Sequence, residues 1–391
     1  MLTSKAVYGV WNPRTWQRRY WAVRQFIAQT NDQLRQHGAR VARLTGKSRL
    51  RQTLEILRAA MGYGKLSAEE YYRYQLYGRN EGRTRFIGFA REERIRRALD
   101  MERWYVVVND KLLLSALLNH LELPTPRLLA VYHQHRNAGS VKAIRSTVEL
   151  KHYLRHEAGT PFVAKPIFGA FGRGVYAVSH FETASDTLVL NNDTTLSIES
   201  FNESLVDPWG EGYLFQELLK PHPQIAERCG TIICCARLIL FMDKSGPRIW
   251  KAIWRIPGKG SMIDNRDNPD TLIAPVDPAS GKIGLLVAGE GPTMKQLEQH
   301  PLTGQKLAGF ILPNWDETVK HCLSAATFFP SLWIQAWDIA LTDHGPSLLE
   351  VNPVGGMRTP QLAFNCGSLD RDLLSFLREH HVPIRRIPNH R

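Results

Sequence analysis

IQAWDIALTDHGPSLLEVNP, residues 334 to 353, contains two apolar runs separated by the turn-forming residues Asp343 to Pro346. The two runs are therefore predicted to pair as antiparallel strands of a β-hairpin. A pairing centred on His344 places residue 338 opposite residue 350. Strand side chains alternate between two faces, so the predicted polar face carries Asp338, Ala340, Glu350 and Asn352. The predicted apolar face, which belongs in a core, carries Ile339, Leu341, Leu349 and Val351.

The polar face of this hairpin brings two carboxylates and an amide together. Without a cation, Asp338 and Glu350 would repel each other across the strand pair. With the amide oxygen of Asn352 they form the all-oxygen set that Mg²⁺ prefers when it also holds nucleotide phosphates. A magnesium site is one interpretation of the pattern, and a solvated acidic hairpin is the other.

PFVAKPIFGAFGRGVYAV, residues 161 to 178, has the pattern of a strand, a glycine-rich loop and a second strand. Lys165 ends the first apolar run, and the loop contains Gly169, Gly172 and Gly174. Glycines let a backbone approach a phosphate and aim N–H groups at it, while a lysine adds a positive charge. No helix follows the glycines directly, so the pattern is neither a Walker loop nor a dinucleotide fingerprint. A phosphate-binding loop and a plain hairpin bend both fit.

An amphipathic helix is predicted to begin at Lys111, with Asp110 as its N-cap, and to stop before Pro124. The order of this lysine, Lys165, the segment YLFQELL and the terminal Asp…Glu-x-Asn set resembles ATP-grasp enzymes. The chain is more closely similar to the sugar-transfer associated ATP-grasp family, which is related to the α-L-glutamate ligases. The resemblance covers residues from about 65 to about 375. Segments that carry it include VNDKLLLSALLNHLELPTP, LLKPHPQIA, CCARLIL, WRIPGKGSMIDN, HPLTGQKLAGFILPNWDETV and WDIALTDHGPSLLEVNPVGG.

The resemblance implies an α+β ATP-grasp fold, in which two lobes enclose the nucleotide, after a mainly helical basic N-terminal region. It implies ATP and Mg²⁺ as cofactors, with Mg²⁺ on the hairpin residues Asp338, Glu350 and Asn352. Phosphate contacts are implied at Lys111 and Lys165. An adenine-binding linker is implied at Gln216, Glu217 and Leu219.

Two arginines receive catalytic roles from the resemblance: Arg237 would face the reacting phosphoryl group, and Arg255 would line the acceptor side. Asp264 and Asn265 match a family pair on the substrate side. Two departures affect this side of the site. The double glycine of the family is replaced by Asn268-Pro269-Asp270, and a family threonine is replaced by Cys235.

The activity that the resemblance implies is ATP-dependent carboxylate–amine ligation through an acyl phosphate, in sugar or cell-envelope polysaccharide biosynthesis. The substrates would be a small-molecule or glycan carboxylate and an amine. One alternative is an ATP-grasp peptide ligase or a kinase that acts on a small molecule. Another is a non-catalytic adaptor that binds an anionic polymer, although such an adaptor would need none of Lys111, Lys165, Asp338 and Glu350.

The composition is that of a globular protein, with 43% hydrophobic and 22% charged residues in 391. No apolar run approaches the ~18 residues of a membrane span, and the N-terminus lacks a signal-peptide core. A cytoplasmic enzyme is therefore expected. The five cysteines are odd in number and lack C-x-x-C spacing, so neither a disulfide framework nor a zinc site is expected.

Positive charge is concentrated in the first quarter of the chain. Residues 1 to 100 contain 21 Lys and Arg against 8 Asp and Glu, whereas the remainder is balanced. Much of this quarter has helical periodicity with arginines between the apolar positions. An acidic polymer or an anionic membrane surface is a candidate partner, a solvated face is the alternative, and nucleic acid is not expected. The predicted organisation is a basic helical region 1–100, an ATP-grasp N-terminal part 101–212, a C-terminal lobe 213–378 with the metal site, and a basic tail 379–391.

Overall fold

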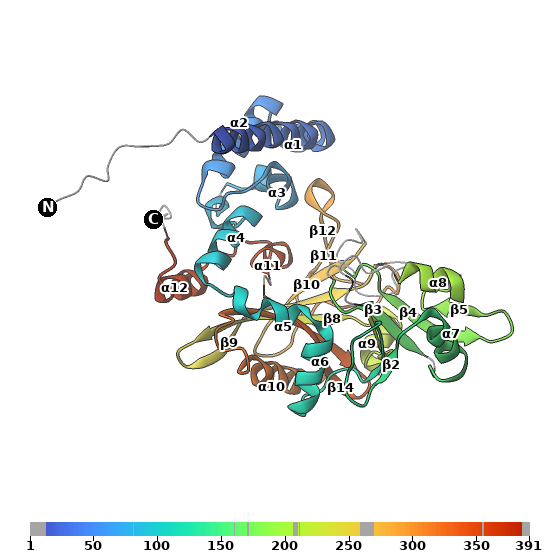
Figure 1. Cartoon of the computed structure of the whole chain (residues 1–391). Helices are drawn as coiled ribbons and strands as arrows, with labels where there is room; N and C mark the ends of the chain where they lie inside the picture. The colour runs from blue at the N-terminus through green and yellow to red at the C-terminus, as the bar shows by residue number, and fades with distance from the viewer. Residues whose placement is uncertain are drawn as a thin grey trace.

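The computed structural model describes residues 13–80, 82–159, 161–169, 172–205, 210, 212–258, 270–353 and 356–384. These residues form two seven-stranded sheets that are surrounded by helices, with a helical hairpin before them (Figure 1). The prediction of an α+β fold preceded by a helical region is confirmed.

The first sheet has the strand order β2-β1-β7-β3-β4-β5-β6. Its strands are β1 (Leu128–Tyr132), β2 (Lys142–Ile144), β3 (Phe162–Pro166), β4 (Tyr176–Glu182), β5 (Thr187–Leu190), β6 (Thr195–Ser197) and β7 (Tyr213–Glu217). β1 and β2 are parallel, and the other neighbours are antiparallel. Helices α7 (Thr147–His156) and α8 (Ile198–Ser204) contribute to the core of this sheet. The strand–loop–strand prediction for 161–178 is confirmed by the β3–β4 pairing.

The second sheet is antiparallel throughout, in the order β12-β11-β10-β9-β8-β13-β14. Its strands are β8 (Cys235–Asp243), β9 (Gly246–Ile256), β10 (Leu272–Val276), β11 (Leu286–Ala288), β12 (Lys295–Leu297), β13 (Ile334–Thr342) and β14 (Gly345–Asn352). Helix α10 (Trp315–Ala326) packs against β13 and β14. The largest core of the described residues lies around this sheet and includes the fully buried indoles of Trp254 and Trp337.

The predicted terminal hairpin is formed by β13 and β14, and the predicted pairing of Asp338 with Glu350 is confirmed. Nearer the turn, however, Thr342 pairs with Gly345, so the register changes by one residue along the hairpin. A β-bulge absorbs the extra residue at Leu349. The expectation that Leu349 lies on the core face is therefore wrong: Leu348 is fully buried, and Leu349 lines the cavity described below.

The N-terminal hairpin consists of α1 (Pro13–Thr45) and α2 (Arg49–Met61). It packs on α3 (Ala68–Arg73), whose first turn is closed by a reciprocal capping box between Ser67 and Glu70. Tyrosines fill the space between the hairpin and α3, and two of them anchor α2. Tyr71 donates to Glu55 at 2.6 Å, and Tyr72 donates to Gln52 at 2.7 Å.

Residues 85–92, which follow the hairpin, bind the segment that follows the second sheet. The amide of Gln361 both accepts from Ile87 N (2.7 Å) and donates to Ile87 O (2.9 Å). Buried Glu92 of α4 (Phe89–Ala98) accepts from Met357 N at 2.9 Å and from Arg358 Nε at 2.6 Å. The predicted basic helical region 1–100 thus contacts residues that are more than 260 positions away in the sequence.

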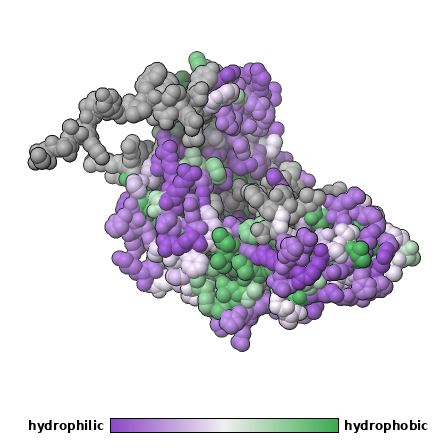
Figure 2. All heavy atoms as spheres, in the orientation of Figure 1, coloured by the Kyte–Doolittle hydropathy of each residue, from purple (hydrophilic) through white to green (hydrophobic). Residues whose placement is uncertain are grey.

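The remaining helices surround these units: α5 (Tyr105–Asn109), α6 (Lys111–His120), α9 (Pro223–Cys229), α11 (Thr359–Ala363), α12 (Arg371–Glu379) and the 3₁₀ turns Leu76–Gly78, Arg83–Arg85, Glu102–Trp104 and Gly291–Thr293. Figure 2 shows a hydrophobic area over α5 and α6, where Val106 and Leu113 are exposed. None of the described helices has the combination of length and apolar character needed to cross a membrane.

Candidate functional site

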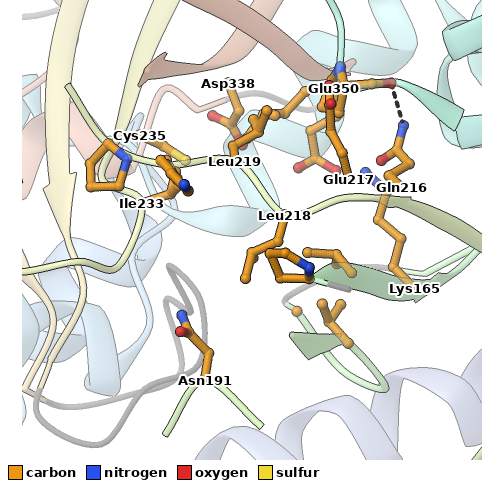
Figure 3. A pocket seen from close by; sticks show the side chains of 18 of the residues that line it. Lys165, Asn191, Gln216, Glu217, Leu218, Leu219, Ile233, Cys235, Asp338 and Glu350 are labelled. Carbon is orange, nitrogen blue, oxygen red and sulfur yellow. Dashed lines mark hydrogen bonds between the residues drawn. The ribbon is translucent and has the colours of Figure 1, made fainter. Parts of the chain in front are cut away.

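A cavity of about 660 Å³ is lined by residues of both sheets and by the segment that joins β7 to α9. Lys165 lies at the end of β3, while Asp338 and Glu350 come from β13 and β14. Figure 3 shows these side chains together with those of residues 216–219. Volumes of roughly 300–1,000 Å³ are typical of pockets for drug-sized ligands and cofactors.

Two lysines predicted to bind phosphate line this cavity. Lys111 begins α6, where Asp110 caps the helix by accepting from Leu112 N and Leu113 N, as predicted. The Lys111 ammonium donates to the carbonyl of Gly169 at 2.7 Å, so it is tied to the glycine-rich loop. Burial lowers the pKa of Lys111, and the Glu350 carboxylate partly offsets that shift. Burial, followed by the neighbouring Lys111 cation, lowers the pKa of Lys165 to about 8.

The three glycines of the loop have different environments. Gly169 and Gly172 line the cavity. Gly174 is not among the lining residues; its φ is +70° and a Cβ there would meet the Tyr213 hydroxyl at 2.8 Å. Gly174 therefore allows the close approach of buried Tyr213, while the other two glycines face the space where a ligand would lie.

Residues 216–219, which the resemblance assigns to the adenine-binding linker, line the cavity. Buried Gln216 donates to Pro126 O at 3.3 Å. Glu217 accepts from Arg127 N at 2.8 Å. Leu218 and Leu219 add apolar surface, so this wall combines fixed polar groups with aliphatic side chains.

The acidic set of the hairpin gathers at another wall. Nδ2 of Asn352 lies 3.3 Å from Asp338 Oδ2 and 3.2 Å from Glu350 Oε1, so one amide reaches both carboxylates. Asp338 and Glu350 line the cavity, whereas Asn352 is not among the lining residues. Among the described residues, no three His, Cys, Asp or Glu side chains gather as a candidate metal cluster.

Two buried arginines hold Asp338. Arg237 donates from Nε and Nη2 to the two carboxylate oxygens at 2.6 and 2.5 Å. Arg255 lies 3.1 Å from Oδ2 of the same carboxylate. Although burial opposes ionisation, the two guanidinium groups hold the pKa of Asp338 well below its usual range. Arg255 lines the cavity, whereas Arg237 is not among the lining residues and contacts Asp338, which is.

These donors fit Mg²⁺ in chemistry. Two carboxylates supply hard oxygens, and a half-turn of the Asn352 amide would replace Nδ2 with Oδ1. Glu350 is partly exposed, and its Oε1 accepts from Asn352 at 3.2 Å, so its carboxylate has further oxygen lone pairs to offer. Asp338 would share its oxygens between the arginines and the ion.

Several residues of the cavity have no distinctive sequence signal. Asn191, Ile233 and Arg173 line it, although they belong to a turn, a loop and the glycine-rich segment. Leu349 lines it because of the bulge. Cys235, which replaces the family threonine, also lines the cavity. The predicted substrate residues Asp264 and Asn265 lie outside the described residues.

Comparisons with solved structures find distant likenesses. They include D-alanyl-alanine synthetase A from Vibrio cholerae, with 13% identity, 70% of this chain and 63% of that chain covered, and a TM-score of 0.38. D-alanine–D-alanine ligase from Bacillus anthracis complexed with ATP has 14% identity, coverages of 70% and 68%, and a TM-score of 0.36. The biotin carboxylase domain of 2-oxoglutarate carboxylase from Hydrogenobacter thermophilus, in complex with MgADP, ADP and bicarbonate, has 14% identity, coverages of 66% and 42%, and a TM-score of 0.33.

The solved relatives are too distant to carry an argument about activity, and this chain spans less than half of the Hydrogenobacter chain that it matches. No curated protein matches the sequence. The sequence profile of one family, described as sugar-transfer associated ATP-grasp, matches residues 90–375. That match covers well over half of the chain and includes the β3–β4 loop, the linker, both arginines and the acidic hairpin. The chain therefore belongs to the sugar-transfer associated ATP-grasp family.

Proposed function

We propose that the protein is an ATP-dependent carboxylate–amine ligase that uses Mg²⁺ and forms an acyl phosphate. The observation that carries this proposal is that one cavity is lined by Lys111 and Lys165, by the carboxylates of Asp338 and Glu350 and by Arg255. The Glu350 charge acts on both lysines. A triphosphate requires the lysines, a metal ion requires the carboxylates and an anionic acceptor requires the arginine, all in one place.

The cavity suggests how the nucleotide would bind. Its phosphates would lie between the two lysines and the Gly169–Gly172 backbone, where Lys111 is already fixed by the Gly169 carbonyl. The adenine would lie against Leu218 and Leu219, close to the polar groups of Gln216 and Glu217. An apolar wall with a few fixed polar groups is typical of a purine site.

Glu350, Asp338 and Asn352 would hold Mg²⁺, which when bound neutralises phosphate charge and orients the triphosphate. The pairing of Asp338 with two arginines places two positive groups next to this carboxylate before any ligand arrives. Arg237 positions Asp338. Arg255, which lines the cavity, would contact the phosphoryl group as it moves or the acceptor carboxylate.

The proposed reaction has two steps. An oxygen of the acceptor carboxylate attacks the γ-phosphorus of ATP, the bond to the bridging oxygen breaks, and ADP leaves. The amine nitrogen then attacks the acyl carbon, phosphate leaves with the bonding electron pair, and the amine loses a proton to solvent. Both steps need positioning and positive charge more than a nucleophilic side chain, and a well-aimed donor can lower such a barrier by roughly 3 kcal/mol.

The family description supports substrates connected with sugar transfer. We therefore propose an acidic sugar or envelope-polysaccharide carboxylate as acceptor and an amine as its partner. Because the reaction consumes ATP, the proposal places it in the cytoplasm. Arg255 in the cavity wall favours an anionic carboxylate over the neutral hydroxyl that a kinase would use.

The products of the reaction test the proposal. Purified protein is incubated with MgATP, candidate uronic acids and candidate amines, and nucleotides are separated by chromatography. We expect ADP and phosphate to form only when the acid is present, and hydroxylamine to capture the acyl phosphate as a hydroxamate. AMP as the sole nucleotide product, or phosphate retained on the acceptor, would refute the ligase mechanism. Glu350→Gln serves as the inactive control.

A further inference from the structure

Helix α2 carries a row of apolar side chains on its outer surface. Leu50, Leu54, Leu57 and Met61 follow one another at steps of four, three and four residues, which places them on one side of an α-helix. Their exposed fractions are 72%, 48%, 38% and 71%. We call these four residues the outer stripe. Apolar side chains scattered singly on a surface need no explanation, but an aligned row does.

The opposite side of α2 is already occupied, so the helix cannot turn to bury the outer stripe. Ile56 and Gln52 are fully buried between α2 and its neighbours. The Gln52 amide donates to Gly38 O at 3.0 Å and to Lys47 O at 2.9 Å, and it accepts from the Tyr72 hydroxyl. Rolling α2 would break these buried hydrogen bonds. The outer stripe is therefore a fixed feature of the folded protein.

The charges around the outer stripe are positive. Arg49, Arg51 and Arg58 are exposed on α2. The acidic residue of this helix, Glu55, is only 10% exposed at its side chain and is paired with Lys47. Aliphatic side chains flanked by arginines have the chemistry of a lipid interface.

We propose that the α1–α2 hairpin docks on an anionic lipid surface, with the outer stripe of α2 entering the boundary between headgroups and acyl chains. An acidic polymer would explain the arginines but would leave the four apolar side chains in water. A second copy of the chain would bring two rows of arginines together, and like charges repel. Neither the apolar row nor its positive borders depends on the proposed ligase activity. In Figure 1 the hairpin lies at an outer side of the molecule, where α1 contacts the turn between β11 and β12.

Vesicle co-sedimentation with the full-length protein tests this inference. The probes are vesicles of phosphatidylcholine alone and vesicles of phosphatidylcholine and phosphatidylglycerol in equal parts. We expect binding to the anionic vesicles and little binding to the neutral ones. The triple variant Leu54→Gln, Leu57→Gln, Met61→Gln should bind the anionic vesicles at least about tenfold more weakly. Arg51→Gln with Arg58→Gln should also weaken binding roughly tenfold.

A matched control separates the outer stripe from surface hydrophobicity in general. Val148, Leu302 and Ile311 are exposed apolar residues outside the hairpin, and their joint replacement by Gln should leave vesicle binding unchanged. Circular dichroism and thermal unfolding check that every variant is folded. The inference would be overturned if the folded stripe variant bound anionic vesicles as tightly as the wild type. It would also be overturned if the protein bound heparin as tightly as vesicles and the stripe substitutions left heparin binding unchanged. A wild-type dimer that the stripe variant fails to form would overturn it as well.

Discussion

Asp338 and Glu350 face each other across one strand pair, but their surroundings differ, so substitutions at the two residues should have different effects. Asp338 is 2% exposed and forms ion pairs with two buried arginines. Glu350 is partly exposed, and no ion pair between it and an arginine is found among the described residues. Removing charge from Glu350 alters the cavity. Removing charge from Asp338 also leaves two buried guanidinium groups without their counter-charge.

Glu350→Gln is expected to abolish turnover while the protein stays folded. The substitution conserves volume and removes one charged Mg²⁺ ligand, so the rate should fall by about 100-fold or more. The free energy of unfolding should change by less than about 1 kcal/mol. Coupled ATP turnover and urea unfolding measure both quantities. Wild-type turnover in this variant would remove Glu350 from the metal site.

Asp338→Asn is the comparison, and here we expect a loss of about 3 kcal/mol of stability because a buried ion pair is broken. Its inactivity alone would therefore say nothing about metal binding. If this variant and the wild type unfold at the same urea concentration, the ion pairs of Asp338 with the two arginines contribute less to the free energy of unfolding than their burial suggests.

Nucleotide binding is expected to take up protons near pH 8. Burial and Lys111 lower the pKa of Lys165 to about 8, so the amine is partly neutral in the free protein at that pH. Bound phosphates favour the ammonium form, and the site should gain up to about half a proton per nucleotide from Lys165. Uptake should vanish well below pH 8, where the lysine is already charged, and affinity should fall as the pH rises through 8. Isothermal calorimetry in buffers of different ionisation enthalpy measures the number of protons taken up.

Lys165→Arg is the matched control for this measurement, because an arginine stays charged throughout the range. Any uptake that remains in this variant belongs to other groups, with Lys111 the first candidate because burial also lowers its pKa. Equal proton uptake in the wild type and Lys165→Arg would contradict the assignment to Lys165.

At the scale of elements, the β3–β4 loop separates two roles of glycine. Gly174→Ala should destabilise the protein by roughly 2 kcal/mol, since it places a Cβ 2.8 Å from the Tyr213 hydroxyl at a φ of +70°. Gly169→Ala should change stability by less than about 0.5 kcal/mol, because its nearest contact is an ordinary 3.4 Å to Pro166. Denaturant unfolding of both variants measures the difference. Equal losses would mean that the Tyr213 approach does not control the loop.

Periodicity and turn residues predict the elements of this chain well. The terminal hairpin, the strand–loop–strand around Lys165 and the Asp110 cap all follow from local chemistry that the structure repeats. Residue alternation misses the bulge at Leu349, because the sequence SLLEV contains no glycine that would mark it. The bulge lets Glu350 pair with Asp338 while Gly345 pairs with Thr342 at the turn. Both pairings depend on the tertiary structure rather than on the local sequence.

The candidate site is predictable where one residue type performs one task. Lysines, glycines and acids at the ends of strands indicate phosphate and metal chemistry. The pairing of Arg237 and Arg255 with the same carboxylate depends instead on the order β9-β8-β13, which local patterns cannot supply. Cavity residues such as Ile233 and Asn191 are ordinary loop and turn residues until the fold places them.

For the whole molecule, the separation of charge has a measurable consequence. None of the residues that line the cavity belongs to the described part of the α1–α2 hairpin. Screening at 0.1 M salt limits exposed charges to about 10 Å. Arg24→Glu with Arg35→Glu should therefore leave MgATP affinity within about twofold of wild type, as measured by calorimetry. A tenfold change would place the hairpin in contact with the nucleotide site.

The contacts of residues 85–92 with residues 357–369 also determine when the early segment can complete its folding during synthesis. Ile87 is synthesised 274 residues before its partner Gln361, and Glu92 is synthesised 265 residues before its partner Met357. At about 5–20 residues per second, the early segment waits roughly 15 to 55 seconds for its partners. During that interval the Glu92 carboxylate and the Ile87 backbone have water or a chaperone as their neighbours. A ribosome-bound chain whose residues 357–369 are still inside the exit tunnel should therefore remain sensitive to protease between residues 85 and 99, and the chain released from the ribosome should be protected there.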